Sequence, residues 1–347
     1  MKKTFFFLIL LVLTTLFYSC STKVDLYAEY KDIPVIYGLL DVTQDTNYVK
    51  IVRAFSGSNE ASINANEVAL IADSCNYPGK LDAYICRYRN TYGYEYVFED
   101  SIKLDTLTIH NKEEGVFYAP TQKVYFAKSD QSNWNTGFFK PNVGSKRYRY
   151  KLVVYKDNDT VTAETGLVGG EDFRLVTTSV TFVSTPNDKT GKISFKSADN
   201  GEVYDLSFQF NYSEKKQGVI TDKYVKYSFG SHNLDEYEYD EGIYYTYYDQ
   251  NLLFNLLASA IGTDTINVER YIGDFTITLA AGGEELYNYI QVNAPSGGFS
   301  QTIPDYTNIN GGYGVFSSRM NLTNKVNLSA KTQTDLLGMP WGFRQRN

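Results

Sequence analysis

The sequence predicts a mainly β protein of two domains. The first is an N-terminal antiparallel β-sandwich of immunoglobulin-like type, and the second is a C-terminal β-rich domain with one or two short helices. The 347 residues include 31 Tyr and 21 Phe but only 8 Pro, and aromatic side chains favour the pleated, half-buried surfaces of sheets. Short apolar or alternating runs also recur at intervals typical of antiparallel sandwiches.

The N-terminal half contains the clearest strand of the chain, at residues 147–156. A turn at 157–159 then returns the chain along 160–165 as an antiparallel partner. Residues 48–54 alternate between apolar and polar side chains, which predicts a strand with one dry and one wet face. The other strands that we expect in this half are 33–40, 67–72, 83–88, 94–99, 103–109, 115–118 and 123–126.

A Gly-Gly pair within residues 166–172 predicts a linker, so we expect domains at 20–165 and 173–347. Residues 205–212 alternate cleanly, which places one set of apolar side chains on one face of a strand. That set is Leu206, Phe208, Phe210 and Tyr212. The strands that we expect in the second domain are 173–183, 192–196, 202–212, 223–229, 270–280 and 315–321.

Two segments of the second domain have helical periodicity. Residues 251–261 place leucines at helical spacing along one side, and Asp249 or Asn251 can cap the start of this helix. Residues 284–292 begin with Glu284 and Glu285, where the helix dipole favours negative charge. The second domain is therefore expected to be mostly sheet with a helical insert.

The first 19 residues predict a lipoprotein signal peptide that ends before Cys20. Lys2 and Lys3 precede an apolar run from Phe5 to Leu16, which is too short for a stable membrane span. We expect the mature chain to begin at Cys20 and to be anchored there by acyl chains. The alternative is a secretory signal with an incidental cysteine. Ser21 after the cysteine favours the outer membrane, on the cell surface or the periplasmic face.

Charge excludes two classes of partner. The net charge of −7 becomes −9 when Lys2 and Lys3 leave with the signal. An acidic chain without a basic stripe is a poor ligand for nucleic acid. Attraction to anionic lipid is equally disfavoured, so membrane attachment depends on the acyl anchor.

Two further cysteines, Cys75 and Cys86, are a candidate disulfide pair. Each lies beside a predicted strand, at 67–72 and at 83–88, and the residues between them include the turn signal Pro78-Gly79. An oxidising compartment would permit a bridge between them. We expect this bridge, if formed, to be structural.

The sequence offers no catalytic constellation. Only two histidines, His110 and His232, are present, and neither has a partner at metal-ligand spacing. No serine stands in a nucleophile elbow. The glycine-rich run at 311–314 lacks the Lys-Ser/Thr of a phosphate-binding loop and indicates a tight turn that enters a strand. We therefore predict no enzyme, no metal site and no cofactor.

Residues 235–249 are the one biased segment, with acidic residues interleaved with tyrosines. Tyrosine rings can stack on sugars while carboxylates bind hydroxyls, and carboxylates can also bind calcium or form a glycosidase pair. The remaining interpretation is a solvated loop or edge strand whose charges deter aggregation. The candidate ligand-binding residues are Tyr237, Tyr239, Tyr244, Tyr245, Tyr247 and Tyr248.

Several segments, in their order along the chain, resemble a family of uncharacterised Bacteroidota outer-membrane lipoproteins that is known as a domain of unknown function. The segments that carry the resemblance are 35–40, 150–154, 163–165, 204–214, 286–290 and 309–316. The resemblance implies an N-terminal β-sandwich and a larger C-terminal β-rich part. It also implies a gene often placed near TonB-dependent outer-membrane transporters, and it brings no catalytic residues.

These observations favour a non-enzymatic outer-membrane lipoprotein that binds a ligand or partner beside a nutrient-uptake system. The expected partners are the membrane through the acyl chains, a TonB-dependent transporter, and a glycan or peptide ligand. A structural, adhesion or envelope-assembly role is the alternative, and a carboxylate-based glycan hydrolase is a third.

Overall fold

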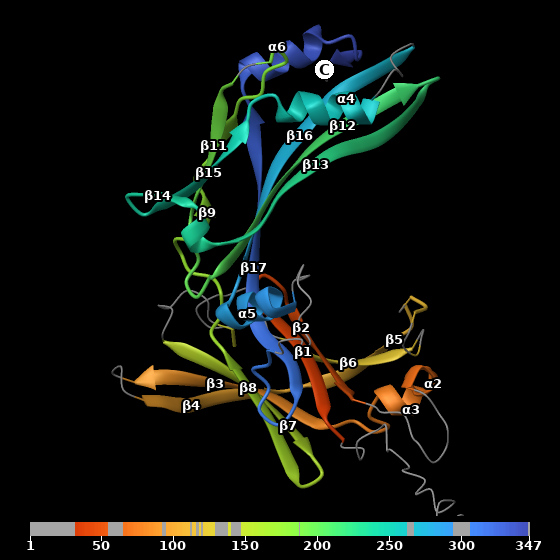
Figure 1. Ribbon diagram of the computed structural model, residues 1–347, viewed down its shortest axis with the longest axis vertical. Coiled ribbons are helices and arrows are strands. Elements are labelled where there is room, and N and C mark those ends of the chain that lie inside the picture. The colour runs from red at the N-terminus through yellow and green to blue at the C-terminus, as the bar shows by residue number, and fades with distance from the viewer. Residues whose placement is uncertain are drawn as a thin grey trace, which may run out of the picture.

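A computed structural model describes residues 32–54, 65–91, 95–111, 113–115, 118, 121–128, 138–139, 147–186, 188–261, 267–293 and 306–345. These residues form two lobes that long strands join at a narrow waist (Figure 1). The predicted mainly β fold class is confirmed. The predicted signal segment 1–19 and Cys20 lie outside the described residues. Among the helices that are described, none is long and apolar enough to cross a membrane.

One sheet runs through both lobes in the order β13-β12-β16-β17-β1-β2-β6-β5, and two short strands, β10 and β18, pair with β17 and β16. Its strands are β1 (Pro34–Asp41), β2 (Thr46–Arg53), β5 (Asp105–Ile109), β6 (Gln122–Lys128), β10 (Ser179–Val180), β12 (Val203–Lys216), β13 (Val219–Asn233), β16 (Val268–Gly282), β17 (Tyr313–Leu328) and β18 (Phe343–Arg344). Several of these strands are longer than the sequence predicted, because the polar residues at their ends still pair with the neighbouring strands.

Strand β17 belongs to both lobes (Figure 1). Its first half pairs in parallel with β1, and its second half pairs antiparallel with β16. The run at 311–314 is a tight turn that enters this strand, as predicted. Gly314 has a φ of +110°, and a Cβ there would lie 2.0 Å from the carbonyl oxygen of Ile36. Only glycine permits this close approach of β17 to β1.

The lower lobe is a β-sandwich. One layer is the β17-β1-β2-β6-β5 end of the long sheet, and the other is an antiparallel sheet in the order β4-β3-β7-β8. The second sheet consists of β3 (Asp82–Thr91), β4 (Glu95–Lys103), β7 (Tyr148–Lys156) and β8 (Asp159–Thr165). The two layers meet where the backbone N–H of Leu81 donates to the hydroxyl of Tyr125, at 2.9 Å. The predicted antiparallel sandwich has one exception, because β1 and β17 pair in parallel.

The predicted strand at 67–72 is wrong, because this segment forms two short helices. They are α2 (Ala65–Ala69) and α3 (Ala72–Cys75), which a turn at Leu70 separates. Alanine is the strongest helix former, and Glu67 lies in the first turn of α2, where the helix dipole favours it. The predicted strand at 115–118 lies partly outside the described residues.

The upper lobe packs the other end of the long sheet against a small sheet and two helices. The small sheet has the order β14-β15-β11-β9. The elements are β9 (Arg174–Leu175), β11 (Thr190–Lys196), η1 (Leu234–Glu236), β14 (Glu238–Asp240), β15 (Ile243–Asp249), α4 (Leu252–Ile261) and α6 (Ala330–Gly338). Phe182 is buried between the layers, with its ring 5.6 Å from that of Phe208 and 4.9 Å from that of Tyr248.

The predicted helices are both present. Helix α4 matches the prediction at 251–261, and the side chain of Asp249 accepts a hydrogen bond from the N–H of Asn251 at 2.8 Å, just before the helix begins. Helix α5 (Glu284–Asn293) matches the prediction at 284–292. It lies at the waist beside β17 (Figure 1). Helix α6 was not predicted.

At the waist, residues from both sides of the predicted linker at 166–172 are hydrogen-bonded to one another. The linker therefore does not separate the chain into two independent halves. The carboxylate of Glu285 accepts hydrogen bonds from the hydroxyls of Thr165 and Ser317, at 2.9 and 3.0 Å. The hydroxyl of Ser318 donates to the carbonyl of Gly166 at 2.6 Å. Segment 306–319 of the predicted C-terminal domain, 173–347, therefore belongs with the lower lobe. One continuous apolar core extends through both lobes.

Candidate functional site

The six tyrosines that the sequence singled out lie in and around the β14–β15 hairpin, at one end of the small sheet (Figure 1). Glu241 and Gly242 form its turn, and both have positive φ. Strand β15 pairs with β14 on one side and with β11 on the other. Because side chains alternate along a strand, the tyrosines of β15 point to two opposite faces.

Tyr237 and Tyr248 are core residues and not ligand-binding residues. The Tyr237 ring lies edge-on to Phe195 at 5.0 Å, and its hydroxyl donates to the carbonyl of Tyr204. The hydroxyl of Tyr248 accepts from the N–H of Thr181 at 3.0 Å. Burial raises the pKa of both phenols. The prediction that these two residues bind a ligand is therefore wrong, because both rings are enclosed.

Tyr244 shares the inward face of β15 with Tyr248. Its ring is stacked on Phe195 at 6.0 Å and contacts Tyr239 at 4.9 Å. Tyr239 is well exposed at the edge of the sheet on β14. This pair therefore closes the edge of the upper-lobe core, with the Tyr244 ring partly buried and the Tyr239 ring largely exposed.

Tyr245 and Tyr247 point to the outward face of the small sheet. Their rings are 5.7 Å apart, but they are nearly perpendicular, at 81°, so they do not form one flat platform. The ammonium of Lys192 lies 3.3 Å from the centre of the Tyr245 ring and covers one of its faces. Tyr247, which is 52% exposed, is the one ring of this pair with a largely open surface.

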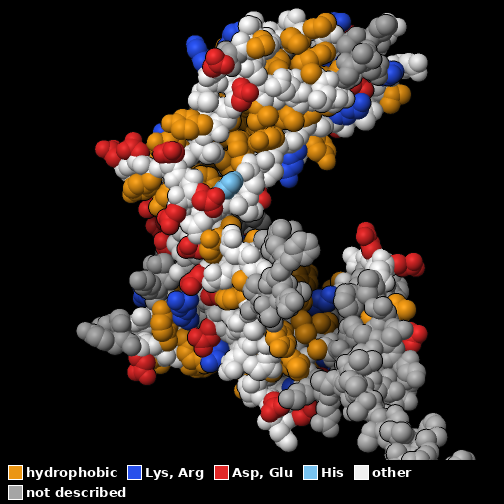
Figure 2. Space-filling model, viewed as in Figure 1, with side chains coloured by type: hydrophobic (Ala, Val, Ile, Leu, Met, Phe, Trp, Pro, Cys, Tyr) orange, Lys and Arg blue, Asp and Glu red, His pale blue; other side chains and the backbone are white. Residues whose placement is uncertain are grey.

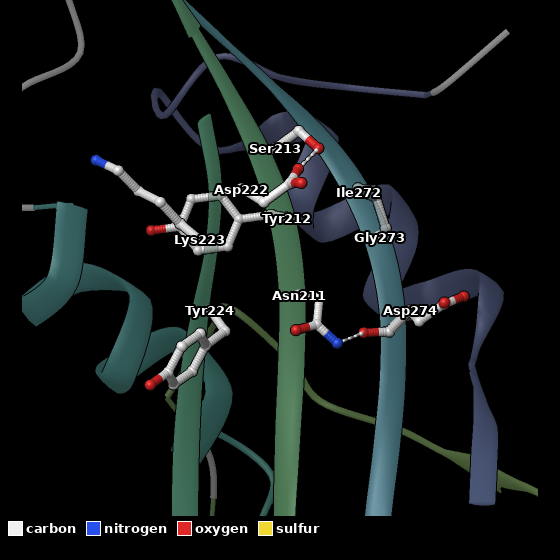
Figure 3. A pocket seen from close by; sticks show the side chains of 9 residues that line it. All are labelled: Asn211, Tyr212, Ser213, Asp222, Lys223, Tyr224, Ile272, Gly273 and Asp274. Carbon is white, nitrogen blue, oxygen red and sulfur yellow. Dashed lines mark hydrogen bonds between the residues drawn. The ribbon is translucent and has the colours of Figure 1, made fainter. Parts of the chain in front are cut away.

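A groove lies on the long sheet, where β12, β13 and β16 run side by side (Figure 3). This groove has a volume of about 470 Å³. Cross-strand pairs place Asn211 opposite Tyr224 and Ser213 opposite Asp222, so these four side chains share the outward face. The complete lining is Asn211, Tyr212, Ser213, Asp222, Lys223, Tyr224, Ile272, Gly273 and Asp274.

A bulge in β16 creates the groove. The register between β12 and β16 shifts between Phe210 and Tyr212, where β16 carries one extra residue. A Cβ at Gly273 would lie 2.6 Å from the carbonyl oxygen of Asn211, so the strand needs glycine here. The amide of Asn211 reaches across the bulge and donates to the carbonyl of Asp274 at 3.2 Å (Figure 3).

The polar side chains of the groove are held in place by neighbours. The hydroxyl of Ser213 donates to the carboxylate of Asp222 at 2.7 Å (Figure 3). The amide of Gln209 donates to the side-chain oxygen of Asn211, also at 2.7 Å. Tyr224 is 62% exposed, so its ring is open to a ligand. The groove thus combines an open aromatic ring with fixed amide and carboxylate groups.

A buried ion pair supports the same three strands from the inward face. Arg270, which is only 1% exposed, donates from Nε and Nη2 to one carboxylate oxygen of Glu214, at 2.9 and 2.7 Å. Its Nη1 donates to the carbonyl of Trp341 at 2.7 Å. Lys223, from β13, binds the other oxygen of Glu214 at 2.7 Å. Glu214 therefore ties β12 to β13 and β16 next to the groove.

Charge sets the pKa of Glu214. Burial acts to raise the pKa of this carboxyl, but hydrogen bonds and the positive charges of Lys223 and Arg270 outweigh burial. The pKa therefore lies below its ordinary value of 4.5.

Sequence reasoning did not identify the groove. Its lining residues come from three strands and are ordinary in type, so no motif marks them. One signal was available, because Gly273 interrupts an otherwise regular strand pattern and such a glycine indicates a bulge or a close backbone approach.

The remaining chemistry-bearing residues are dispersed. No disulfide joins Cys75 and Cys86 in the structure. Cys75 ends helix α3 and its sulfur bonds the carbonyl of Ala69, whereas Cys86 lies on β3, where burial raises the pKa of its thiol. Within the described part of the chain, no group of three or more His, Cys, Asp and Glu residues could hold a metal ion.

The histidines have structural partners. His110 bonds the hydroxyl of Thr121 at 3.1 Å. His232 bonds the carboxylate of Glu236 and the carbonyl of Phe229. These interactions raise the pKa of His232, chiefly through the hydrogen bond with Glu236.

In comparisons with known proteins, no protein-family model and no curated protein matches the sequence.

Replacing Tyr248 by alanine should destabilise the upper lobe by about 3–5 kcal/mol, the range for removing a buried aromatic ring. Tyr247→Ala, one position along the same strand, should change the free energy of unfolding by no more than about 0.5 kcal/mol, because its ring is largely exposed. Chemical denaturation of the two variants measures the difference. Equal effects would show that Tyr248 is not a core residue.

Replacing Glu214 by glutamine should cost roughly 3–5 kcal/mol, because Arg270 would keep a buried charge without its carboxylate. The matched control is Glu269→Gln on the same strand as Arg270, where the ion pairs are more exposed and the loss should be about 1 kcal/mol or less.

The stabilising effect of Glu214 also depends on pH. Because its pKa is lowered in the folded protein, the stabilisation is fully present above pH 4.5 and is lost as the pH falls through the lower, folded-state value. Denaturation midpoints between pH 7 and pH 3 should therefore converge for the wild type and Glu214→Gln. A constant difference across that range would contradict this assignment.

Proposed function

We propose that this protein is a lipid-anchored, non-enzymatic binding protein of the outer membrane. In this proposal its groove over β12, β13 and β16 takes a hydroxyl-rich ligand such as an oligosaccharide. The observation that carries the proposal is the lining of the groove. An exposed tyrosine ring stands opposite an asparagine, and a carboxylate that a serine holds in place lies beside them.

The chemistry of the lining suits sugars. One face of a pyranose ring is apolar and stacks on an aromatic ring, whereas its hydroxyls need both donors and acceptors. Tyr224 offers the ring, and Asp222 and Asn211 offer acceptors and donors that neighbouring residues already orient. Little side-chain entropy is lost on binding when polar groups are fixed beforehand.

The proposed location rests on the N-terminal sequence. The short apolar run that ends before Cys20 supports acylation of this cysteine, and the resemblance to Bacteroidota lipoproteins supports a place beside a TonB-dependent transporter. In that setting the protein would capture external glycan for uptake. A structural or assembly role is the second proposal, and the long exposed edge of β13 favours it.

Tyr224→Ala should weaken binding to a matching oligosaccharide roughly tenfold, the loss expected for one stacking ring. Asn211→Ala should weaken it by a similar factor, whereas Tyr247→Ala on the small sheet should leave it unchanged. The acylated full chain in detergent would first be screened on a glycan array and then titrated with the best oligosaccharide. Equal loss in all three variants, or no binding to any glycan, would contradict the groove as a sugar site.

The proposed surface location predicts that protease added to intact cells cleaves the protein without lysis. A Cys20→Ser chain should be released from the membrane fraction, because it cannot be acylated. Protection from protease until lysis would place the lobes in the periplasm and favour envelope assembly. Retention of the Cys20→Ser chain in membranes would contradict the anchor.

A further inference from the structure

The outer backbone edge of β13 plays no part in the proposed sugar site. β13 is the terminal strand of the long sheet, and no other strand of the described residues pairs with its outer edge. It runs along the side of the upper lobe, where Figure 2 shows the surface hollowed between the two lobes. An exposed strand of 15 residues presents a row of backbone donors and acceptors that can pair with another strand.

The hairpin turn fixes which backbone groups point outward. Gln217 and Gly218 form a two-residue turn with positive φ at both positions, and Lys216 and Val219 pair across it. Residues that flank such a turn exchange hydrogen bonds within the hairpin, and the pattern then alternates. The outward N–H and C=O groups therefore belong to Ile220, Asp222, Tyr224, Lys226 and Ser228.

This outward set is symmetric about Tyr224. The turn ends it on one side. A bulge ends it on the other, because the register between β12 and β13 shifts after Ser228 and Gly230 has positive φ. A second copy of the same segment, running antiparallel, can thus pair along its full regular length only when Tyr224 lies opposite Tyr224.

Charge favours the same register, because no other centre places Asp222 opposite Lys226. With Tyr224 opposite itself, Asp222 of each strand lies opposite Lys226 of the other, and opposite charges across an antiparallel pair are stabilising. Shifting the centre by one residue to Lys223, or by two to Asp222 or Lys226, places like charges directly opposite each other. Asp222 and Lys226, the two side chains that would pair, are both exposed. The hydroxyl of Ser213 donates to one carboxylate oxygen of Asp222, which leaves the other oxygen for Lys226.

We propose that two copies of this protein dimerise through β13, antiparallel and about a two-fold axis at Tyr224, so that the long sheet continues from one copy into the next. Lysines on edge strands often deter aggregation. Here, however, Lys226 of each copy meets Asp222 of the other in the register that pairs the full regular length of the edge. Attachment of both copies to one membrane would raise their local concentration and favour this pairing.

The dimer goes beyond the proposed sugar site and does not need it. Tyr224 and Asp222 also line the groove, so two-fold pairing would bring two grooves side by side across the axis. The two proposals fail independently, because dimer formation is measured without glycan and glycan affinity can be measured on Asn211→Ala, outside the edge.

A cysteine at the symmetry axis tests the dimer. In the acylated full chain in membranes, Tyr224→Cys should form a disulfide-linked dimer on mild oxidation, because facing residues of this kind have Cα atoms about 5.5 Å apart. Tyr247→Cys replaces another exposed tyrosine, on the small sheet of the upper lobe, and is the matched control. The unsubstituted chain reports any linkage through Cys75 and Cys86. We expect at least fivefold more dimer from Tyr224→Cys than from either.

Charge reversal then tests the register. Lys226→Asp added to Tyr224→Cys should reduce the linked dimer at least fivefold, because Asp222 would face an aspartate. Adding Asp222→Lys as well should restore it, since the opposite charges return in exchanged positions. Equal linkage in Tyr224→Cys and Tyr247→Cys, indifference to both charge changes, or linkage of Tyr224→Cys to a different protein would each overturn the proposal.

Discussion

The structure depends on one strand that serves two lobes. The first half of β17 completes the lower-lobe sandwich beside β1, and its second half lies in the upper-lobe sheet beside β16. Gly314 permits the backbone approach to Ile36, and the buried hydroxyls of Ser317 and Ser318 bind Glu285 and Gly166 at the waist. Each lobe therefore orients the other through the continuous ladder of β17.

Local sequence patterns predicted most strands and two helices, because alternation and helical spacing are local properties. Such local patterns do not indicate which distant strands pair with each other. Nothing in residues 33–40 shows that their partner lies near the C-terminus, so the sequence suggested two successive domains where the chain instead returns to the first lobe. The helices α2 and α3 were missed because a short apolar run fits either type of element, and alanine content decided the outcome.

The candidate site was predicted only in part. Composition drew attention to the tyrosines around 235–249, but composition cannot separate buried rings from exposed ones. The pair Glu241-Gly242 is a hairpin turn, and with that turn recognised the alternation along β15 would have assigned Tyr248 to the core and Tyr247 to the surface. The groove depends on a bulge in β16 and on the neighbours of three strands, which only the fold brings together.

The abundance of tyrosine has a packing explanation as well. Tyr125, Tyr150, Tyr204 and Tyr248 are all buried, and the hydroxyl of each bonds a backbone group of a connecting segment or loop. A phenol can fill the core like phenylalanine and still satisfy a backbone group that leaves the sheet there. The tyrosines thus hold irregular segments against the sheets, which a wholly apolar core could not do.

The shared strand also constrains how the chain reaches its folded state. Among the described strands β1 comes first and β17 is the last long one, so the lower sandwich cannot close until residues 313–328 have been synthesised. Contacts between such distant residues are slow to form. Until then β1 has an unpaired edge, which invites association with other chains. The protein is therefore expected to need protection from aggregation between its synthesis and the arrival of its C-terminal strand.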